Sequence, residues 1–338
     1  MQNSTPQPIP ERQNVTPSEF REEILPAGRP VIMRGLVADW PIVAAGRRSP
    51  AALCSYIRGF DRGQPVSTAF GPPSLNGRLF YNDDVSGLNF RSNKAKLSAS
   101  LDYLIEHQDD DDASALAVQS VPTRGALPGF EEANPNPILG GVEPRVWIGN
   151  KVIIAPHYDP SENIACVVAG RRRFTLFPPE QIANLYIGPF ELTPAGATIS
   201  MVSLEDPDLE RYPRFAEAMK AAVVADLEPG DAIYVPYMWW HHVRSLGNVN
   251  VLVNYWWSDH DKARGEPRDA LLHAMLAIKA LPPRQRAAWR AHFDHYVFQT
   301  TGDPGAHLPE ERRGIIGTLT NDAIRSIKGA LATKMTRG

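Results

Sequence analysis

Residues 151–177, KVIIAPHYDPSENIACVVAGRRRFTLF, contain three short apolar runs separated by turn residues. Similar runs precede and follow them, from RVWIG at 145–149 to NVNVLVNYWW at 248–257. Short, closely spaced strands with turn residues between them are typical of a β-barrel or a β-sandwich. The sequence therefore predicts a β core over about residues 145–257.

Segments with helical patterns lie on both sides of this core. Thr16-Pro17-Ser18-Glu19 has the residue types of a helix start, and residues 95–108 carry apolar side chains at helical spacing. We expect residues 1–17 to form a flexible arm, residues 18–263 one domain, and residues 264–338 a helical region. The predicted fold class is α+β, mainly β, with flanking N-terminal helices and a C-terminal helical extension.

The bulk composition excludes several classes of protein. With a net charge of −3, the chain has no basic bias toward nucleic acid or an anionic membrane. Its two cysteines, Cys54 and Cys166, are too few and too far apart for a disulfide framework or a CxxC zinc site. The chain has no run of about 18 apolar residues, and its N-terminus lacks the apolar core of a signal peptide. We therefore expect a soluble, cytoplasmic protein.

A candidate metal site lies in two of the apolar runs. His157 and Asp159 are two positions apart, and residues i and i+2 of a strand point to the same face. His241 follows about 80 residues later, after a Pro-Gly-Asp turn. Two imidazoles and one carboxylate form the facial set of non-haem iron(II) oxygenases, which leaves positions for a 2-oxo acid and O₂. A zinc hydrolase uses similar ligands, and the spacing alone does not separate the two.

A cation follows the first part of this site. In a strand that starts after Gly170, Arg171 and Arg173 lie on one face, with Arg172 and Phe174 on the other. A guanidinium pointing into the core can hold the distal carboxylate of 2-oxoglutarate through two parallel hydrogen bonds. The alternative is that all three arginines are surface charges.

Two blocks of the sequence resemble a known family. They are HYDPSENIACVVAGRRRFTLFPPEQ (157–181) and PGDAIYVPYMWWHHVRSLGNVNVLVNYWW (229–257). They are similar to the Jumonji-C group of cupin-type Fe(II)- and 2-oxoglutarate-dependent oxygenases, in the branch that holds the asparaginyl hydroxylase of hypoxia-inducible factor and bacterial cupin-like proteins. The resemblance implies a double-stranded β-helix (jelly-roll) core with the metal between its two sheets.

The resemblance also assigns site residues. It implies that His157, Asp159 and His241 bind iron, with His242 as the alternative to His241. Adjacent strand residues face opposite ways, so only one of the two histidines can join the ligand face.

Further residues are assigned around the co-substrate. The resemblance places Asn163 and Asn254 beside 2-oxoglutarate and suggests that Tyr81 reaches the same carboxylate. Arg172 stands where the family usually has lysine. Ile154 stands where the asparaginyl hydroxylase has threonine.

The expected function is an Fe(II)/2-oxoglutarate-dependent dioxygenase that hydroxylates a protein side chain or a small molecule. One alternative is a metal-binding cupin with isomerase or hydrolase activity, and another is a non-catalytic cupin that serves as a binding module. The C-terminal helices resemble dimerising helices of the family, which implies a homodimer; helices that fold back onto their own core are the alternative. Neither nucleic acid nor a membrane is an expected partner.

Overall fold

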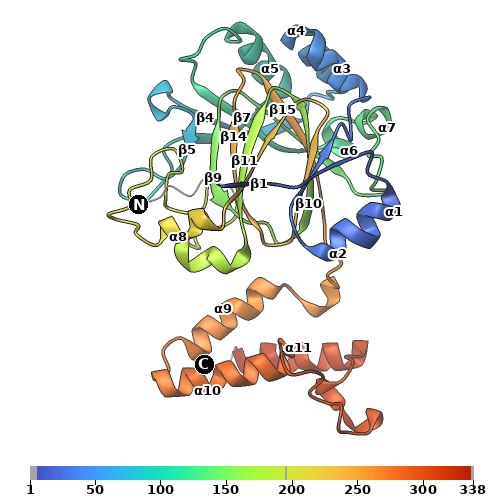
Figure 1. Ribbon diagram of the computed structural model, residues 1–338, viewed down its shortest axis with the longest axis vertical. Helices are drawn as coiled ribbons and strands as arrows, with labels where there is room; N and C mark the ends of the chain where they lie inside the picture. The colour runs from blue at the N-terminus through green and yellow to red at the C-terminus, as the bar shows by residue number, and fades with distance from the viewer. Residues whose placement is uncertain (1–5, 195, 336–338) are drawn as a thin grey trace. The chain divides into compact units, whose positions relative to one another are not determined.

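The computed structural model describes residues 6–194 and 196–335. The chain divides into two compact units, one through Ser258 and one from Asp259 onward (Figure 1).

Two β-sheets form the centre of the first unit. Most neighbouring strands are antiparallel, and the predicted β core corresponds to β8–β15. The six-stranded sheet has the order β1 (Gln7–Pro8), β12 (Val223–Leu227), β11 (Arg172–Phe177), β14 (Trp240–Ser245), β9 (Ile153–His157), β5 (Arg78–Leu79). The nine-stranded sheet has the order β2 (Glu11–Gln13), β3 (Val31–Arg34), β13 (Ala232–Val235), β10 (Glu162–Ala169), β15 (Asn250–Trp257), β8 (Pro144–Gly149), β7 (Ala115–Pro122), β4 (Pro65–Gly71), β6 (Arg91–Lys96).

The two sheets pack face to face through alternating side chains. Val167 of β10 points inward and is buried with Phe174 and Leu176 of β11, in a cluster that takes residues from both sheets. Its neighbours Cys166 and Val168 point to the outer side of the nine-stranded sheet. This period of two is the pattern of a sandwich core, and each fully buried apolar side chain contributes about 1.5–3 kcal/mol. The predicted jelly-roll fold is confirmed.

Helices cover the outer faces of both sheets. Ile42, Leu53 and Leu101 come from three different helices and share one buried cluster with outward residues of the nine-stranded sheet. These helices are grouped over one side of the strands in Figure 1. On the other sheet, Phe215 packs with Trp240. The helices of this unit are α1 (Pro17–Glu19), α2 (Leu25–Ala27), α3 (Pro41–Arg48), α4 (Pro50–Arg58), α5 (Leu97–Glu106), α6 (Thr123–Ala126), α7 (Phe130–Ala133), α8 (Phe215–Lys220).

The N-terminal helical segment begins where the sequence predicts. The Thr16 side chain accepts a hydrogen bond from the Glu19 backbone N–H at 3.2 Å. A π-helical turn, Phe20–Ile24, joins α1 to α2, and the segment ends at Gly28 with φ of 56°. A positive φ at a helix end favours glycine, because it has no Cβ to clash.

The expectation of a flexible arm over residues 1–17 is wrong for residues 6–17. Strand β1 pairs with β12 and β2 pairs with β3, both in parallel. Between them, Ile9 is only 2% exposed. The polar, proline-rich composition gives no sign of these two short strands. They form because the free edges of the two sheets supply their hydrogen-bond partners. Residues 1–5 lie outside the described residues.

The second unit is helical, as the sequence predicts from residue 264 onward. It contains α9 (Pro267–Ile278), α10 (Pro283–Tyr296) and α11 (Asn321–Met335), with short 3₁₀ turns at Glu310–Arg312 and Gly314–Ile316. Among the described residues of the whole chain, no helix combines the length and the apolarity that a membrane span needs.

Candidate metal centre

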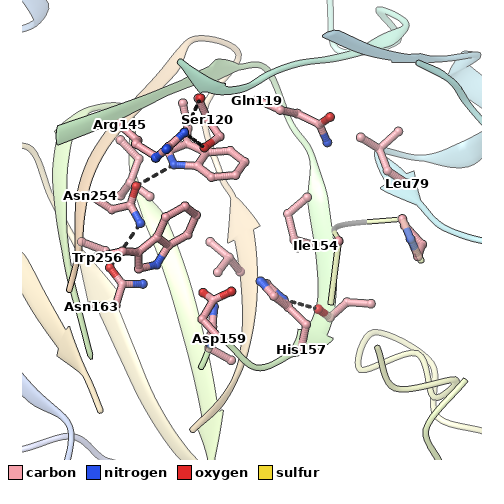
Figure 2. A pocket seen from close by; sticks show the side chains of 18 of the residues that line it. Leu79, Gln119, Ser120, Arg145, Ile154, His157, Asp159, Asn163, Asn254 and Trp256 are labelled. Carbon is pink, nitrogen blue, oxygen red and sulfur yellow. Dashed lines mark hydrogen bonds and ion pairs between the residues drawn. The ribbon is translucent and has the colours of Figure 1, made fainter. Parts of the chain in front are cut away.

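Two side chains from neighbouring strands and one from the loop after the first strand meet in the space between the sheets. His157 ends β9 and lies opposite His241 of β14 in the antiparallel register, with ring centroids 4.1 Å apart. The Asp159 Oδ2 atom lies 3.5 Å from His241 Nε2. One ligand atom from each of the three residues falls within 4.8 Å of the others. Figure 2 shows the side chains of His157 and Asp159 facing the same space.

Asp159 converges on this space although it lies beyond the strand. Strand β9 ends at His157, so the expectation that both residues sit on a strand is wrong for Asp159. Alternation nevertheless continues: Tyr158 points to the other side and packs edge-to-face on Trp240 at 4.8 Å. The Asp159 carbonyl accepts a hydrogen bond from the Met238 N–H at 3.1 Å, which fixes the loop. His157 and Asp159 thus converge as their i, i+2 spacing predicts.

The charges of the three side chains suit a divalent metal. Each histidine holds its Nδ1 atom 3.0 Å from a backbone carbonyl, Ala155 for His157 and Trp239 for His241. An Nδ1–H that donates to a carbonyl leaves Nε2 free to bind a metal. Burial lowers the pKa of His157 to about 4, so its imidazole is neutral near pH 7.

Asp159 supplies the negative charge. Burial pushes the pKa of Asp159 up, but the close approach of His241 outweighs burial and holds the pKa below its usual value. Within residues 6–194 and 196–335, its buried Oδ2 atom has no hydrogen-bond partner. An ionised carboxylate with a buried oxygen beside two imidazoles is a donor set that fits iron(II).

His242 does not take part in this cluster. Its Nε2 atom lies 3.2 Å from Glu205 Oε1, on the opposite side of β14 from His241. The residues behave as adjacent strand positions should, with one side chain on each face. The structure therefore brings His241, and not His242, to Asp159.

The cluster opens into a cavity of about 590 Å³ whose wall includes Arg172. Arg172 begins β11 and is 6% exposed. Its Nε atom has no hydrogen-bond partner in the described part of the chain, and burial lowers its pKa to about 10. The next residue, Arg173, points outward and forms two hydrogen bonds with Asp226, at 2.8 and 2.7 Å. Arg172 thus presents a buried positive charge to the cavity, and this fits an anionic ligand.

Two predicted asparagines line the same cavity. The Trp147 indole N–H donates to Asn254 Oδ1 at 2.8 Å, and Asn254 Nδ2 donates to Asn163 Oδ1 at 3.3 Å. Figure 2 shows this chain running along one wall toward Asp159. The chain of hydrogen bonds fixes the orientation of both amides.

Tyr81 is not brought to the cavity. Its hydroxyl donates to the Leu192 carbonyl at 2.7 Å, and its ring packs in a separate apolar cluster with Ile199. The geometry gives no support to the expected contact with the co-substrate. Ile154 does line the cavity, as an apolar side chain in the place of the family's threonine.

Sequence reasoning did not identify the remaining polar and aromatic wall. The wall contains Trp147 and Trp256, whose rings meet edge-to-face at 5.8 Å. Alternation within PRVWIG and VNYWW would have placed Arg145 with Trp147, and Asn254 with Trp256, on single faces. Which face of each strand lines the cavity depends on the strands that pair with it, and the sequence of the strand alone does not determine this.

Comparison with known proteins places the chain in a family. The family model described as a cupin-like domain matches residues 17–263, so the chain belongs to the cupin-like domain family. Relatives include a Jumonji C domain-containing protein 5 of Drosophila melanogaster, 26% identical over 74% of this chain and 59% of the relative. The HSPB1-associated protein 1 of Homo sapiens is 28% identical over 81% of this chain and 57% of the relative.

A third relative matches a shorter region. The lysine-specific demethylase JMJ31 of Arabidopsis thaliana is 38% identical over 31% of this chain and 18% of its own length. The resemblance to Jumonji-C and cupin-like proteins is therefore confirmed. The chain spans less than two thirds of the length of each of these relatives.

Proposed function

We propose that this protein is an Fe(II)- and 2-oxoglutarate-dependent oxygenase that hydroxylates its substrate. The single observation that carries the proposal is the presence, in one cavity, of the His157–Asp159–His241 cluster and the unpaired, buried Arg172. The cluster provides three ligands on one side of a metal, and the arginine provides a counter-charge for a dicarboxylate.

Each residue has a defined part in this chemistry. His157, Asp159 and His241 would hold iron(II), which would supply the oxidative chemistry that couples decarboxylation of 2-oxoglutarate to oxidation of a substrate C–H bond. Arg172 binds the distal carboxylate and so sets the direction in which the co-substrate enters. Asn163 and Asn254 fix the polar wall beside it. The apolar side chains of Phe174 and Leu252, both on the cavity wall, exclude water from the reacting centre.

Two other functions use parts of the same site. A cupin isomerase or hydrolase that binds zinc, manganese or nickel needs the cluster but has no use for an unpaired arginine beside it. A non-catalytic binding module needs neither. The combination of both features therefore favours the oxygenase.

The proposal is tested by anaerobic reconstitution with Fe(II), followed by addition of 2-oxoglutarate and O₂. Succinate should form in proportion to bound iron, at a low rate without substrate and a higher rate with it. Stoichiometric metal binding without succinate, in the presence of candidate peptides and small molecules, would support the isomerase or hydrolase. A His157→Ala variant is the matched negative control, because it lacks one ligand.

We propose that the primary substrate is a protein side chain or a small molecule, and that the protein works in the cytoplasm. Cys54 and Cys166 support a reducing compartment, because both are buried free thiols. Neither nucleic acid nor a membrane is part of the proposal.

We further propose that the helical second unit joins two copies of the chain. Its apolar side chains are exposed within the chain, among them Leu276 at 77% and Phe298 at 66%. Exposed apolar side chains gathered on one small unit are typical of an interface. Sedimentation equilibrium should report a dimer that Leu276→Glu combined with Phe298→Glu converts to a monomer. A wild-type protein that is monomeric at all concentrations would contradict this.

A further inference from the structure

The cavity has a second polar end, away from the metal cluster. Lys94 of β6 pairs in register with Ser67 of β4, and Ser67 pairs with Gln119 of β7. All three residues line the cavity. Residues in register on neighbouring strands share a face of the sheet, so these side chains form one row across three strands.

Arg145 lines the same cavity from the next strand, β8, where it pairs with Pro122 of β7. Its Nη1 atom donates to the Ser120 hydroxyl at 3.2 Å and to the Ser120 carbonyl at 3.4 Å. Ser120 has a φ of 51° and lies where the register between β7 and β8 shifts, so a bulge turns it toward the arginine. Figure 2 shows Arg145, Ser120 and Gln119 together at the side of the cavity opposite His157 and Asp159.

Both contacts of Arg145 use the same nitrogen. A guanidinium has five N–H donors, and neither Nε nor Nη2 of Arg145 has a hydrogen-bond partner among residues 6–194 and 196–335, so this edge can bind a ligand. This edge presents two parallel donors, the arrangement that matches a carboxylate.

The charges of the cavity wall are unbalanced. The wall contains three cationic side chains, Lys94, Arg145 and Arg172, and a single acidic one, Asp159. Across the described residues, no carboxylate lies within 4.0 Å of Lys94 or Arg145. A cleft lined by charges of one sign concentrates ligands of the opposite sign.

The proposed function accounts for two of these four charges. Asp159 belongs to the metal cluster, and Arg172 serves 2-oxoglutarate. Lys94 and Arg145 are left over; both line the cavity, and Arg145 lies on the side opposite His157 and Asp159 (Figure 2). Neither is required by the metal or by the co-substrate.

We infer that the primary substrate carries a carboxylate, and that Arg145 and Lys94 bind this group while the carbon to be oxidised lies over the metal. The inference rests on the proposed function. A carboxylate can come from an acidic residue of a peptide or from a free carboxylic acid. Trp147 and Trp256, on the wall of the same cavity, provide apolar surface for the carbon chain that joins the carboxylate to the reacting carbon.

The experiment uses the iron-loaded full chain and four probes. Two are peptide pools of equal length with randomised flanks, one with Asp or Glu and one with Asn or Gln at the central position. The other two are a mixture of free dicarboxylic and amino acids and a mixture of the corresponding amides. Each probe is tested for succinate formation above the rate without substrate, and its products are analysed by mass spectrometry for an added oxygen atom.

The acidic pool or the free acids should stimulate turnover at least about tenfold more than the matched amides, the ratio expected from loss of one charged contact. Which of the two stimulates identifies the source of the carboxylate. Equal stimulation by acids and amides, or stimulation by neither, overturns the inference. Succinate formed by the wild-type enzyme without any probe reports on the proposed function separately, so the two can fail independently.

Variants localise the effect. Arg145→Gln should raise the KM for the stimulating acid at least about tenfold and reduce the preference over its amide. Arg145 is partly buried, so its replacement can impair folding. Lys94 is exposed, and Lys94→Glu should reduce the same preference for the acid without that effect on the fold. The control is Arg91→Gln, on the same strand β6 but outside the cavity wall, which should retain wild-type preference. Retention of the preference in both Arg145→Gln and Lys94→Glu would overturn the inference.

Discussion

Replacement of Arg172 by methionine should have opposite effects on folding and on co-substrate binding. The side chain is 6% exposed, and burial lowers its pKa to about 10. A displacement of that size corresponds to roughly 3 kcal/mol of unfavourable free energy for the buried charge. We therefore expect the guanidinium to destabilise the protein when no anion is bound.

The magnitudes follow from this burial. Without 2-oxoglutarate, Arg172→Met should gain about 1–3 kcal/mol of folding free energy, and its Tm should rise by about 2–4 °C for each kcal/mol. Loss of the partner of a buried carboxylate costs about 3–5 kcal/mol, so the Kd for 2-oxoglutarate should rise at least about 100-fold. Excess 2-oxoglutarate should then stabilise the wild type and not the variant.

The assay combines thermal unfolding with calorimetric titration of 2-oxoglutarate into the metal-loaded protein. The matched control is Arg173→Met on the opposite face of β11. Arg173 forms an exposed ion pair with Asp226, so its loss should cost less than about 1 kcal/mol and leave the Kd unchanged. If Arg172→Met binds 2-oxoglutarate as tightly as Arg173→Met does, Arg172 is not the anchor and the reasoning from its burial is wrong.

Three further predictions concern the metal cluster and its wall. His241→Ala should lose stoichiometric Fe(II) in metal analysis, whereas His242→Gln should retain it; the reverse pattern would exchange the two assignments. As the pH falls from about 6.5 to about 4, the metal-free protein should lose about 2–3 kcal/mol of stability in urea unfolding, because the unfolded chain protonates His157 and the folded chain does not. In His157→Gln this part of the pH dependence should be absent, and an unchanged slope would refute the assignment. Asn254→Ala should cost about 1–3 kcal/mol in the same unfolding measurement, because the buried Trp147 indole N–H loses its acceptor, and a cost near zero would show that another group replaces it.

The metal cluster could be predicted because the information for it is local. Alternation of side chains in extended backbone places His157 with Asp159, and separates His241 from His242, whatever the rest of the fold does. The same rule separates Arg172 from its exposed neighbours. Alternation does not say which face of the strand is buried. The inward orientation of Arg172 is determined by the neighbouring strands.

The features of the fold and of the site that the sequence did not predict depend on pairing between segments that are distant in the chain. The row of Lys94, Ser67 and Gln119 exists only because strands β6, β4 and β7 pair in register, and the bulge between β7 and β8 brings Ser120 to Arg145. Residues 7–13 are strands only because two sheet edges are free to receive them. Tyr81 was placed by analogy, and its hydroxyl instead donates to the Leu192 carbonyl.

The most direct test of the oxygenase assignment is the fate of molecular oxygen. The iron-loaded protein is supplied with 2-oxoglutarate under ¹⁸O₂, and the succinate is analysed by mass spectrometry. Oxidative decarboxylation of the co-substrate inserts one atom of O₂ into succinate, so we predict succinate with one ¹⁸O atom, and none in the His157→Ala variant. Metal-loaded protein that forms no succinate, or succinate without ¹⁸O from O₂, would contradict the account.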